Sequence, residues 1–195
     1  MDTLYTSQYL KNLAKNKSVN ESRKMFSVKD SVTDSESFDI FLSHSYLDKD
    51  EVEGLYLELT RMGFSVYVDW IIDPQLDRNN VTKATAMQVR KRLKSSKTLL
   101  LAISVNASVS KWMPWELGYV DGHTEKCAII PVSKSENAPT SYLGVEYLSL
   151  YPFIKKAKDT LGYDRLFVIE EARKYVVLTD WLKGFMPSYK NSVIY

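Results

Sequence analysis

The chain has 195 residues, which suits one domain of ordinary size with terminal additions better than two domains. Its 26 basic and 24 acidic residues give a formal net charge of only +2. A protein that binds nucleic acid through its phosphates usually carries a larger excess of basic residues, so no nucleic-acid partner is expected. A composition of 45% hydrophobic and 12% aromatic residues excludes a chain that is disordered throughout and predicts a globular core.

The chain offers no sign of export or of a membrane span. Its start lacks a basic segment followed by an apolar one, and the longest apolar stretch, near Thr98 to Val105, is far too short to cross a bilayer. Cys127 is the single cysteine, so no internal disulfide can form, and its apolar neighbours predict a buried thiol. We expect a cytoplasmic protein with no membrane partner.

The segment 1–36 is rich in Asn, Ser, Lys and Asp, but four apolar residues recur at helical spacing near its start: Tyr5, Tyr9, Leu10 and Leu13. We interpret 1–36 as an N-terminal extension made of a short amphipathic helix and a linker. A disordered tail is the alternative, because 15–37 offers little to bury.

Strands and helices alternate from Phe38 onward. The apolar run Phe38–Ser43 has the length of a strand. Asp48 stands three residues before Glu51, which is the spacing of a capping box, and the helix that follows should end at Gly63. This order predicts a strand followed by a capped helix.

The next strand–helix unit contains a long connection. The run 64–68 predicts a second strand, and 69–80, with Pro74 and two adjacent Asn residues, predicts a long loop. A helix should cover 82–95. Its basic residues could form a phosphate or membrane patch, but apolar residues lie beneath them, so a solvated helix face is the preferred interpretation.

The centre of the chain predicts the fold. The stretch 98–105 is nearly all apolar, as expected for a central parallel strand covered on both faces. A third helix over 111–123 and a fourth strand over 127–132 complete the alternation. We therefore predict a flavodoxin-like, doubly wound α/β fold with about five parallel strands, helices on both faces and right-handed crossovers. Its interior should include Phe41, Val66, Leu100 and Ile130.

The signals weaken beyond Ser133. Segment 147–151 is the candidate for the fifth strand, 165–168 for another strand, and 179–185 for a short capped helix. We place the domain core at 37–155 and interpret 156–195 as a C-terminal extension that packs on it.

Polar and aromatic side chains follow the carboxyl ends of the predicted strands, where ligands bind in an open parallel sheet. The candidates for ligand contact are Ser43, His44, Ser45, Asp69, Trp70, Trp112 and Glu116, with the segment 104–106 nearby. No Gly-rich phosphate loop is present, which argues against redox dinucleotide binding and P-loop hydrolysis. Two His residues and one Cys without close ligand spacing argue against a metal site. Ser43 and His44 are adjacent and lack a nucleophile elbow, which argues against a Ser-His hydrolase.

The segment Lys111–Tyr119 is the most informative in the chain. Pro114 belongs in the first turn of a helix, which places Glu116 near the helix N-terminus, where the dipole favours an ionised carboxylate. Trp112 lies about one turn away and could form a wall of the same pocket. The alternative is that Glu116 only caps the helix while the Trp rings fill the core.

Two short motifs resemble those of the Toll/interleukin-1 receptor (TIR) domain family. Phe38–His44 resembles the opening box of that family, and Trp112–Glu116 resembles its Trp-x-x-x-Glu motif. The loop that ends at Asn80 stands where the family has its BB loop. The similarity covers about 38–151 in the right order and spacing. The chain looks most like bacterial TIR proteins of anti-phage defence, including the Thoeris type.

The resemblance implies a flavodoxin-like fold, self-association with other TIR subunits and, as in many bacterial and plant members, cleavage of NAD+ by the glutamate of the motif. Glu116 would be the catalytic residue, with the candidates above around the substrate. NAD+ is then a substrate, so neither a cofactor nor a metal is expected. The product would be ADP-ribose or a cyclic or modified ADP-ribose, a diffusible nucleotide signal for a downstream effector.

One departure concerns the loop tip. Many receptor TIR domains have a Pro-Gly pair there, whereas this chain has Asp73–Arg78. This difference weakens any inference about receptor-style adaptor docking.

A single carboxylate suits the implied reaction. The nicotinamide leaves as a neutral pyridine, so no general acid is needed, unlike in hydrolysis of an O-glycoside. Glu116 would stabilise the oxocarbenium-like ribose, and Trp112 or Trp70 would hold a planar ring. The residues leave hydrolysis and cyclisation equally open. Two other functions remain alternatives: a TIR adaptor that acts only by assembly, and a nucleoside-processing enzyme such as a deoxyribosyltransferase-like protein.

Overall fold

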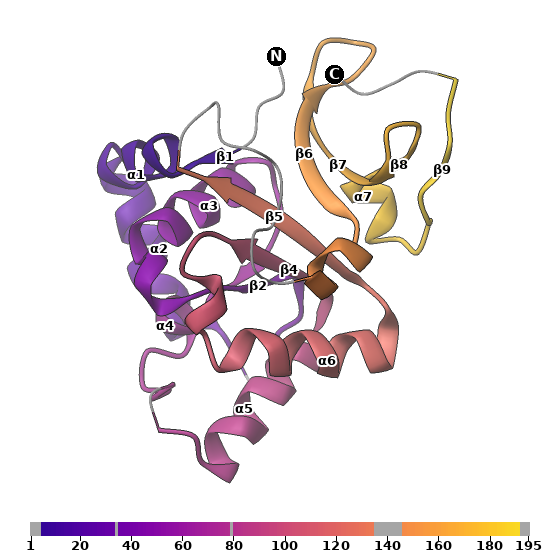
Figure 1. Cartoon of the computed structure of the whole chain (residues 1–195). Coiled ribbons are helices and arrows are strands. Elements are labelled where there is room, and N and C mark those ends of the chain that lie inside the picture. The colour runs from indigo at the N-terminus through magenta and orange to yellow at the C-terminus, as the bar shows by residue number, and fades with distance from the viewer. Residues whose placement is uncertain (1–4, 34, 79, 135–145, 192–195) are drawn as a thin grey trace.

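The computed structural model describes residues 5–33, 35–78, 80–134 and 146–191 and contains a mixed sheet between helices (Figure 1). Within those ranges five strands run parallel in the order β3-β2-β4-β5-β6. They are Phe38–Ser43 (β2), Val66–Tyr67 (β3), Ser96–Ile103 (β4), Cys127–Ser133 (β5) and Phe153–Lys158 (β6). Numbered from β2 as the first, this is the strand order 2-1-3-4-5 of flavodoxin-like folds, which confirms the predicted fold class.

The connecting helices lie on both faces of the parallel strands (Figure 1). They are Lys49–Arg61 (α3), Asp69–Ile72 (α4), Lys83–Lys94 (α5) and Trp112–Thr124 (α6). Short 3-10 helices cover Tyr46–Asp48 (η1) and Ala107–Val109 (η2). The predicted long loop therefore begins with one helical turn, α4, and the second strand is shorter than predicted.

The ends of α3 show one correction and one confirmation. Asp48 makes no side-chain cap hydrogen bond, so the predicted capping box is wrong. Its carboxylate instead accepts hydrogen bonds from Ser104 Oγ and Asn106 Nδ2 after β4, partners that a local pattern cannot show. Gly63 has a φ of 91°, and the amides of Gly63 and Phe64 donate back to Thr60 O and Leu59 O. This is the glycine-dependent helix end that was predicted.

The sheet continues beyond β6 in antiparallel strands, in the yellow part of Figure 1. These strands are Asp164–Glu171 (β7), Lys174–Val177 (β8) and Ser188–Tyr189 (β9), and the short helix Leu178–Trp181 (α7) lies between the last two. The strand predicted at 165–168 is confirmed inside β7. The helix predicted over 179–185 is mostly wrong, since α7 ends at Trp181.

The predicted fifth strand lies at a different place. Residues Glu146–Leu150 form a 3-10 helix (η3) instead of a strand at 147–151. Ile129 N donates to Pro152 O at 2.9 Å, and β6 starts at the following residue, so the strand pairs with β5 only after the proline.

The N-terminal extension is more ordered than the sequence predicted. It forms Tyr5–Thr6 (β1), Ser7–Lys15 (α1) and Val19–Ser31 (α2), so most of the segment predicted as a linker is a helix. A capping box between Ser18 and Glu21 starts α2. Strand β1 pairs in parallel with the carboxyl end of β5.

Helix α1 packs closely on α3. A Cβ at Gly54 would lie 2.2 Å from Leu10 O, so only glycine permits this approach of the two helices. Leu10 is fully buried at the contact, and Ser7 Oγ donates to Glu51 at 2.6 Å. The extension is therefore part of the packed structure.

The predicted core is confirmed. Phe41, Val66, Leu100 and Ile130 are buried, and the free thiol of Cys127 is buried beside them. Burial raises the pKa of Cys127 to about 12, as expected for an unreactive thiol. Among the described residues no helix is both long enough and apolar enough to cross a membrane.

Candidate active site

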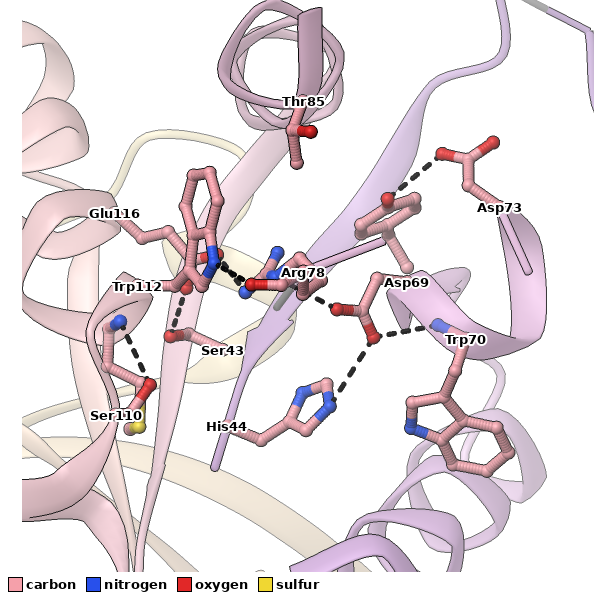
Figure 2. Close-up of polar contacts among 12 residues, drawn as sticks. Ser43, His44, Asp69, Trp70, Asp73, Arg78, Thr85, Ser110, Trp112 and Glu116 are labelled. Carbon is pink, nitrogen blue, oxygen red and sulfur yellow. Dashed lines mark hydrogen bonds and ion pairs between the residues drawn. The ribbon is translucent and has the colours of Figure 1, made fainter. Parts of the chain in front are cut away.

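Glu116 lies one turn inside α6, at the carboxyl end of the parallel strands (Figure 2). The helix begins at Trp112, with Pro114 in its first turn as predicted, and Ser110 Oγ accepts a hydrogen bond from Met113 N. The Glu116 side chain is 0% exposed. A carboxylate can remain in such a place only when its oxygens have partners.

Both Glu116 oxygens are occupied. Ser43 Oγ, at the end of β2, donates to Oε2 at 2.5 Å. Arg78 Nη2 donates to Oε1, also at 2.5 Å. The first contact joins two residues that the sequence proposed for the site. The second brings in Arg78, which the sequence analysis named only as part of the loop-tip segment Asp73–Arg78.

Arg78 also contacts Asp69, the first residue of α4. Arg78 Nε lies 3.1 Å from Asp69 Oδ2, and the other Asp69 oxygen lies 3.4 Å from His44 Nε2. His44 Nδ1 is 2.9 Å from Leu42 O, which fixes the ring orientation. Ser43, Glu116, Arg78, Asp69 and His44 thus form one continuous polar network, drawn in Figure 2.

The charges of this network are unequal. Burial by itself acts to lower the pKa of Arg78, but the carboxylates of Glu116 and Asp69 outweigh that effect and raise the pKa, so the guanidinium stays charged. One guanidinium therefore faces two carboxylates. Arg78 Nη1 is buried and has no hydrogen-bond partner among the described residues.

Trp112 contacts Arg78. Its indole Nε1 donates to Arg78 O at 2.7 Å, and the guanidinium lies 5.0 Å from the centre of the Trp112 ring. The backbone of Arg78 is therefore tied to α6, while its side chain lies between the ring and the two carboxylates.

Two predicted site residues lie outside the network. Ser45 is buried, and its Oγ accepts a hydrogen bond from Leu47 N at the start of η1. Figure 2 shows the Trp70 ring pointing away from Glu116, and Lys49 Nζ lies 4.9 Å from the centre of that ring. Trp70 joins the site only through its backbone, because its N–H donates to Asp69 Oδ1 at 2.7 Å.

Arg78 is the residue that the sequence analysis missed. A buried carboxylate requires a cation or several donors. That requirement, applied to Glu116, would have directed attention to the loop before α5, because loops at the carboxyl edge of the sheet converge there. The predicted loop 69–80 contains one basic residue, Arg78, so this reasoning would have named it as the candidate.

Comparisons with known proteins agree with one another. The family model described as "TIR domain" matches residues 40–166. A Bacillus cereus protein named as a probable 3′ cyclic ADP-D-ribose synthase, ThsB′, is 48% identical over 149 residues, covering 75% of this chain and 76% of the relative. A Cytobacillus dafuensis protein named as a candidate cyclic ADP-D-ribose synthase, TIR2, is 31% identical over 42% of this chain, and the match spans only 22% of that relative.

The comparisons also include a solved structure. It is the TIR domain of the Toll-related receptor TRR-2 from Hydra magnipapillata, with a TM-score of 0.39 and 18% identity. The match covers 55% of this chain and 78% of that domain.

Proposed function

This chain belongs to the TIR domain family, and on that premise we propose that it cleaves NAD+ between nicotinamide and ribose, with Glu116 as the catalytic residue. The observation that carries the proposal is the fully buried Glu116 carboxylate, held at the carboxyl edge of the sheet by Ser43 and Arg78. The names of the two relatives support the substrate, because synthesis of a cyclic ADP-ribose uses NAD+ as the ADP-ribose donor.

The chemistry needs one well-held negative charge. When the bond between the anomeric carbon and the pyridine nitrogen breaks, its electron pair leaves with nicotinamide, which becomes neutral, and the ribose becomes an oxocarbenium-like cation. Glu116 stabilises that cation electrostatically, and its buried surroundings strengthen the effect. Ser43 holds Oε2 in place, so the carboxylate need not reorganise during the reaction.

Arg78 must release Oε1 before this can happen. A guanidinium 2.5 Å from the carboxylate neutralises the charge that the ribose cation needs, and it occupies the oxygen that a ribose hydroxyl would contact. This arrangement is thus a resting state of the site. Binding of NAD+ replaces the Glu116–Arg78 contact with contacts between Glu116 and the ribose.

We propose a cyclic ADP-ribose as the product. An acceptor in the adenosine half of the same molecule attacks the anomeric carbon; an attacking hydroxyl loses its proton, and the ring closes. Attack by water with loss of a proton would give ADP-ribose instead. Support for cyclisation comes from the names of the relatives, and the cyclic product would act as a diffusible signal in anti-phage defence. Mass spectrometry of the products from NAD+ and the purified chain distinguishes a cyclic ADP-ribose from ADP-ribose, which is heavier by one water.

Self-association belongs to the same proposal. One small domain covers little of a dinucleotide, and the resemblance to the TIR family implies self-association, so we expect the 69–80 loop to contribute to a contact between copies. Nicotinamide release per milligram should then fall on dilution over the range in which the chain dissociates. Constant specific activity across that range would contradict the assembly requirement.

Release of nicotinamide from NAD+ by the purified chain is the decisive measurement. A chain that assembles but releases no nicotinamide at any concentration would favour the adaptor function instead. Nicotinamide release from NAD+ by a chain that leaves nucleosides uncleaved would exclude the nucleoside-processing alternative.

A further inference from the structure

The Arg78 guanidinium has more hydrogen-bonding capacity than its present partners use. Nε contacts Asp69 and Nη2 contacts Glu116, while Nη1 is buried without a partner among the described residues. A buried donor without an acceptor is costly, because it has lost its water and gained nothing in exchange. The side chain is therefore incompletely satisfied in the resting state.

A substrate with a diphosphate adds negative charge to a network that already holds two carboxylates. NAD+ carries two phosphate groups, and the network already contains the Glu116 and Asp69 carboxylates. Like charges brought together in a partly buried site repel one another strongly. A cation must offset this repulsion, and Arg78 is the guanidinium that already lies between the two carboxylates.

The position of Arg78 permits the exchange without movement of the loop. Trp112 Nε1 donates to Arg78 O at 2.7 Å, which holds the backbone next to the site when the side chain turns. In NAD+ the diphosphate is attached through the 5′ carbon of the same ribose whose hydroxyls would contact Glu116. A long side chain released from Glu116 can therefore reach the phosphate of the same nucleotide. The planar fork of arginine fits phosphate oxygens in pairs.

We propose that Arg78 is a substrate-binding residue that moves from Glu116 to the diphosphate when NAD+ enters, and that it makes the site selective for phosphate-containing nicotinamide nucleotides. The inference rests on the proposed function, because it assigns the diphosphate contact within the same site. Release of Glu116 and binding of the phosphate are then one event. The Glu116 carboxylate is therefore free of its paired guanidinium only when a phosphate-containing substrate is present.

The test compares three substrates that release the same nicotinamide: NAD+, nicotinamide mononucleotide and nicotinamide riboside, which carry two, one and no phosphate groups. In Arg78→Gln, kcat/KM for NAD+ and for the mononucleotide should fall on the order of tenfold or more relative to kcat/KM for the riboside, mainly through KM. Arg78→Lys should lose less, because it keeps the charge without the fork. Arg90→Gln is the matched control: Arg90 is exposed and lies over Trp115 and Tyr119, and this variant should resemble the wild type. Equal losses for all three substrates in Arg78→Gln would overturn the inference.

Calorimetric binding of ADP-ribose separates this inference from the proposed function. ADP-ribose contains the diphosphate but no bond to cleave, and its affinity should be on the order of tenfold weaker for Arg78→Gln than for the wild type. If Arg78→Gln binds ADP-ribose more weakly than the wild type but the wild type cleaves no NAD+, the diphosphate contact is supported and the proposed activity is wrong. An active wild type whose ADP-ribose affinity is unaffected by the substitution would sink the contact alone.

Discussion

Two buried arginine–carboxylate contacts lie close together in the chain, and they are built differently. In the first, Arg92 donates to both oxygens of Asp73 through Nε and Nη2, each at 2.9 Å, and through Nη1 to Thr33 O at 3.1 Å. Tyr67 adds a further donor to Asp73 at 2.9 Å. All three Arg92 nitrogens and both Asp73 oxygens therefore have hydrogen-bond partners.

The second contact divides one guanidinium between two carboxylates. Arg78 reaches Asp69 with one nitrogen and Glu116 with another, and its third nitrogen is without a partner in the described part of the chain. The first pair is therefore part of the scaffold, and the second can exchange partners. Separating the first leaves several buried groups unpaired, whereas the second has a donor and a surplus carboxylate ready for new partners.

Substitution of Glu116 by Gln should have the largest effect, and it should fall on activity. It keeps the size of the side chain but removes the charge that faces the ribose cation, which costs about 3 kcal/mol or more in the barrier, roughly a hundredfold or greater in rate. Stability should change little, because Arg78 keeps Asp69 as its partner. Nicotinamide release and thermal melts of both proteins check this, and an equally active variant would remove Glu116 from catalysis.

Asp73→Asn should produce the opposite pattern. It leaves the Arg92 charge buried beside a neutral amide, which should lower the free energy of unfolding by about 3 kcal/mol. Activity per folded molecule should stay near that of the wild type, because the Asp73 carboxylate pairs with Arg92 and Tyr67, and its link to the Glu116 network is the backbone N–H that donates to Asp69 O at 2.7 Å, which the substitution keeps. Denaturant unfolding and nicotinamide release are the measurements. A stable Asp73→Asn protein with lost activity would mean that the two contacts are not separable in role.

Each of the two arginine–carboxylate contacts includes one hydroxyl donor, Tyr67 at Asp73 and Ser43 at Glu116, and the two hydroxyls can be removed as a matched pair of substitutions. Tyr67→Phe removes the donor to Asp73 and should cost about 1.5 kcal/mol of stability, the value of a hydrogen bond to a charged group. Ser43→Ala removes the donor that positions Glu116 Oε2 and should lower the rate of nicotinamide release roughly tenfold. If both deletions affect only stability, Ser43 has no part in positioning the carboxylate.

The smallest effect concerns pH. Burial acts to raise the pKa of Asp73, but hydrogen bonds from Arg92 and Tyr67 outweigh it and lower the pKa below the ordinary 3.8. An unfolded chain therefore takes up this proton at higher pH than the folded one, so the Asp73 contribution is fully present above about pH 3.8 and is lost as the pH falls through the lowered value. The stability difference between wild type and Asp73→Asn should shrink in that acid range, as urea unfolding measured at several pH values would show. A difference that stays constant into strong acid would contradict the assignment.

Local patterns in the sequence predict the alternating fold and four of the five residues of the polar network; Arg78 is the one they miss. Apolar runs such as 98–105 predict buried strands from local order alone, and Pro114 predicts the start of α6 and hence the place of Glu116. Ser43 and Glu116 were expected together because parallel strands end at one edge. These features depend on side-chain period and on backbone chemistry, which a linear pattern carries.

Tertiary structure alone decided which charges meet. Arg78, Glu116 and Asp69 lie in three separate segments and meet in the site. Asp48 accepts hydrogen bonds from Ser104 and Asn106 and does not cap its own helix. The segment predicted as a linker became α2, which contacts α4 through packing between distant parts of the chain. A buried charge takes whichever partner the folded loops bring within a few ångströms, and that distance is a property of the closed structure and not of the spacing along the chain.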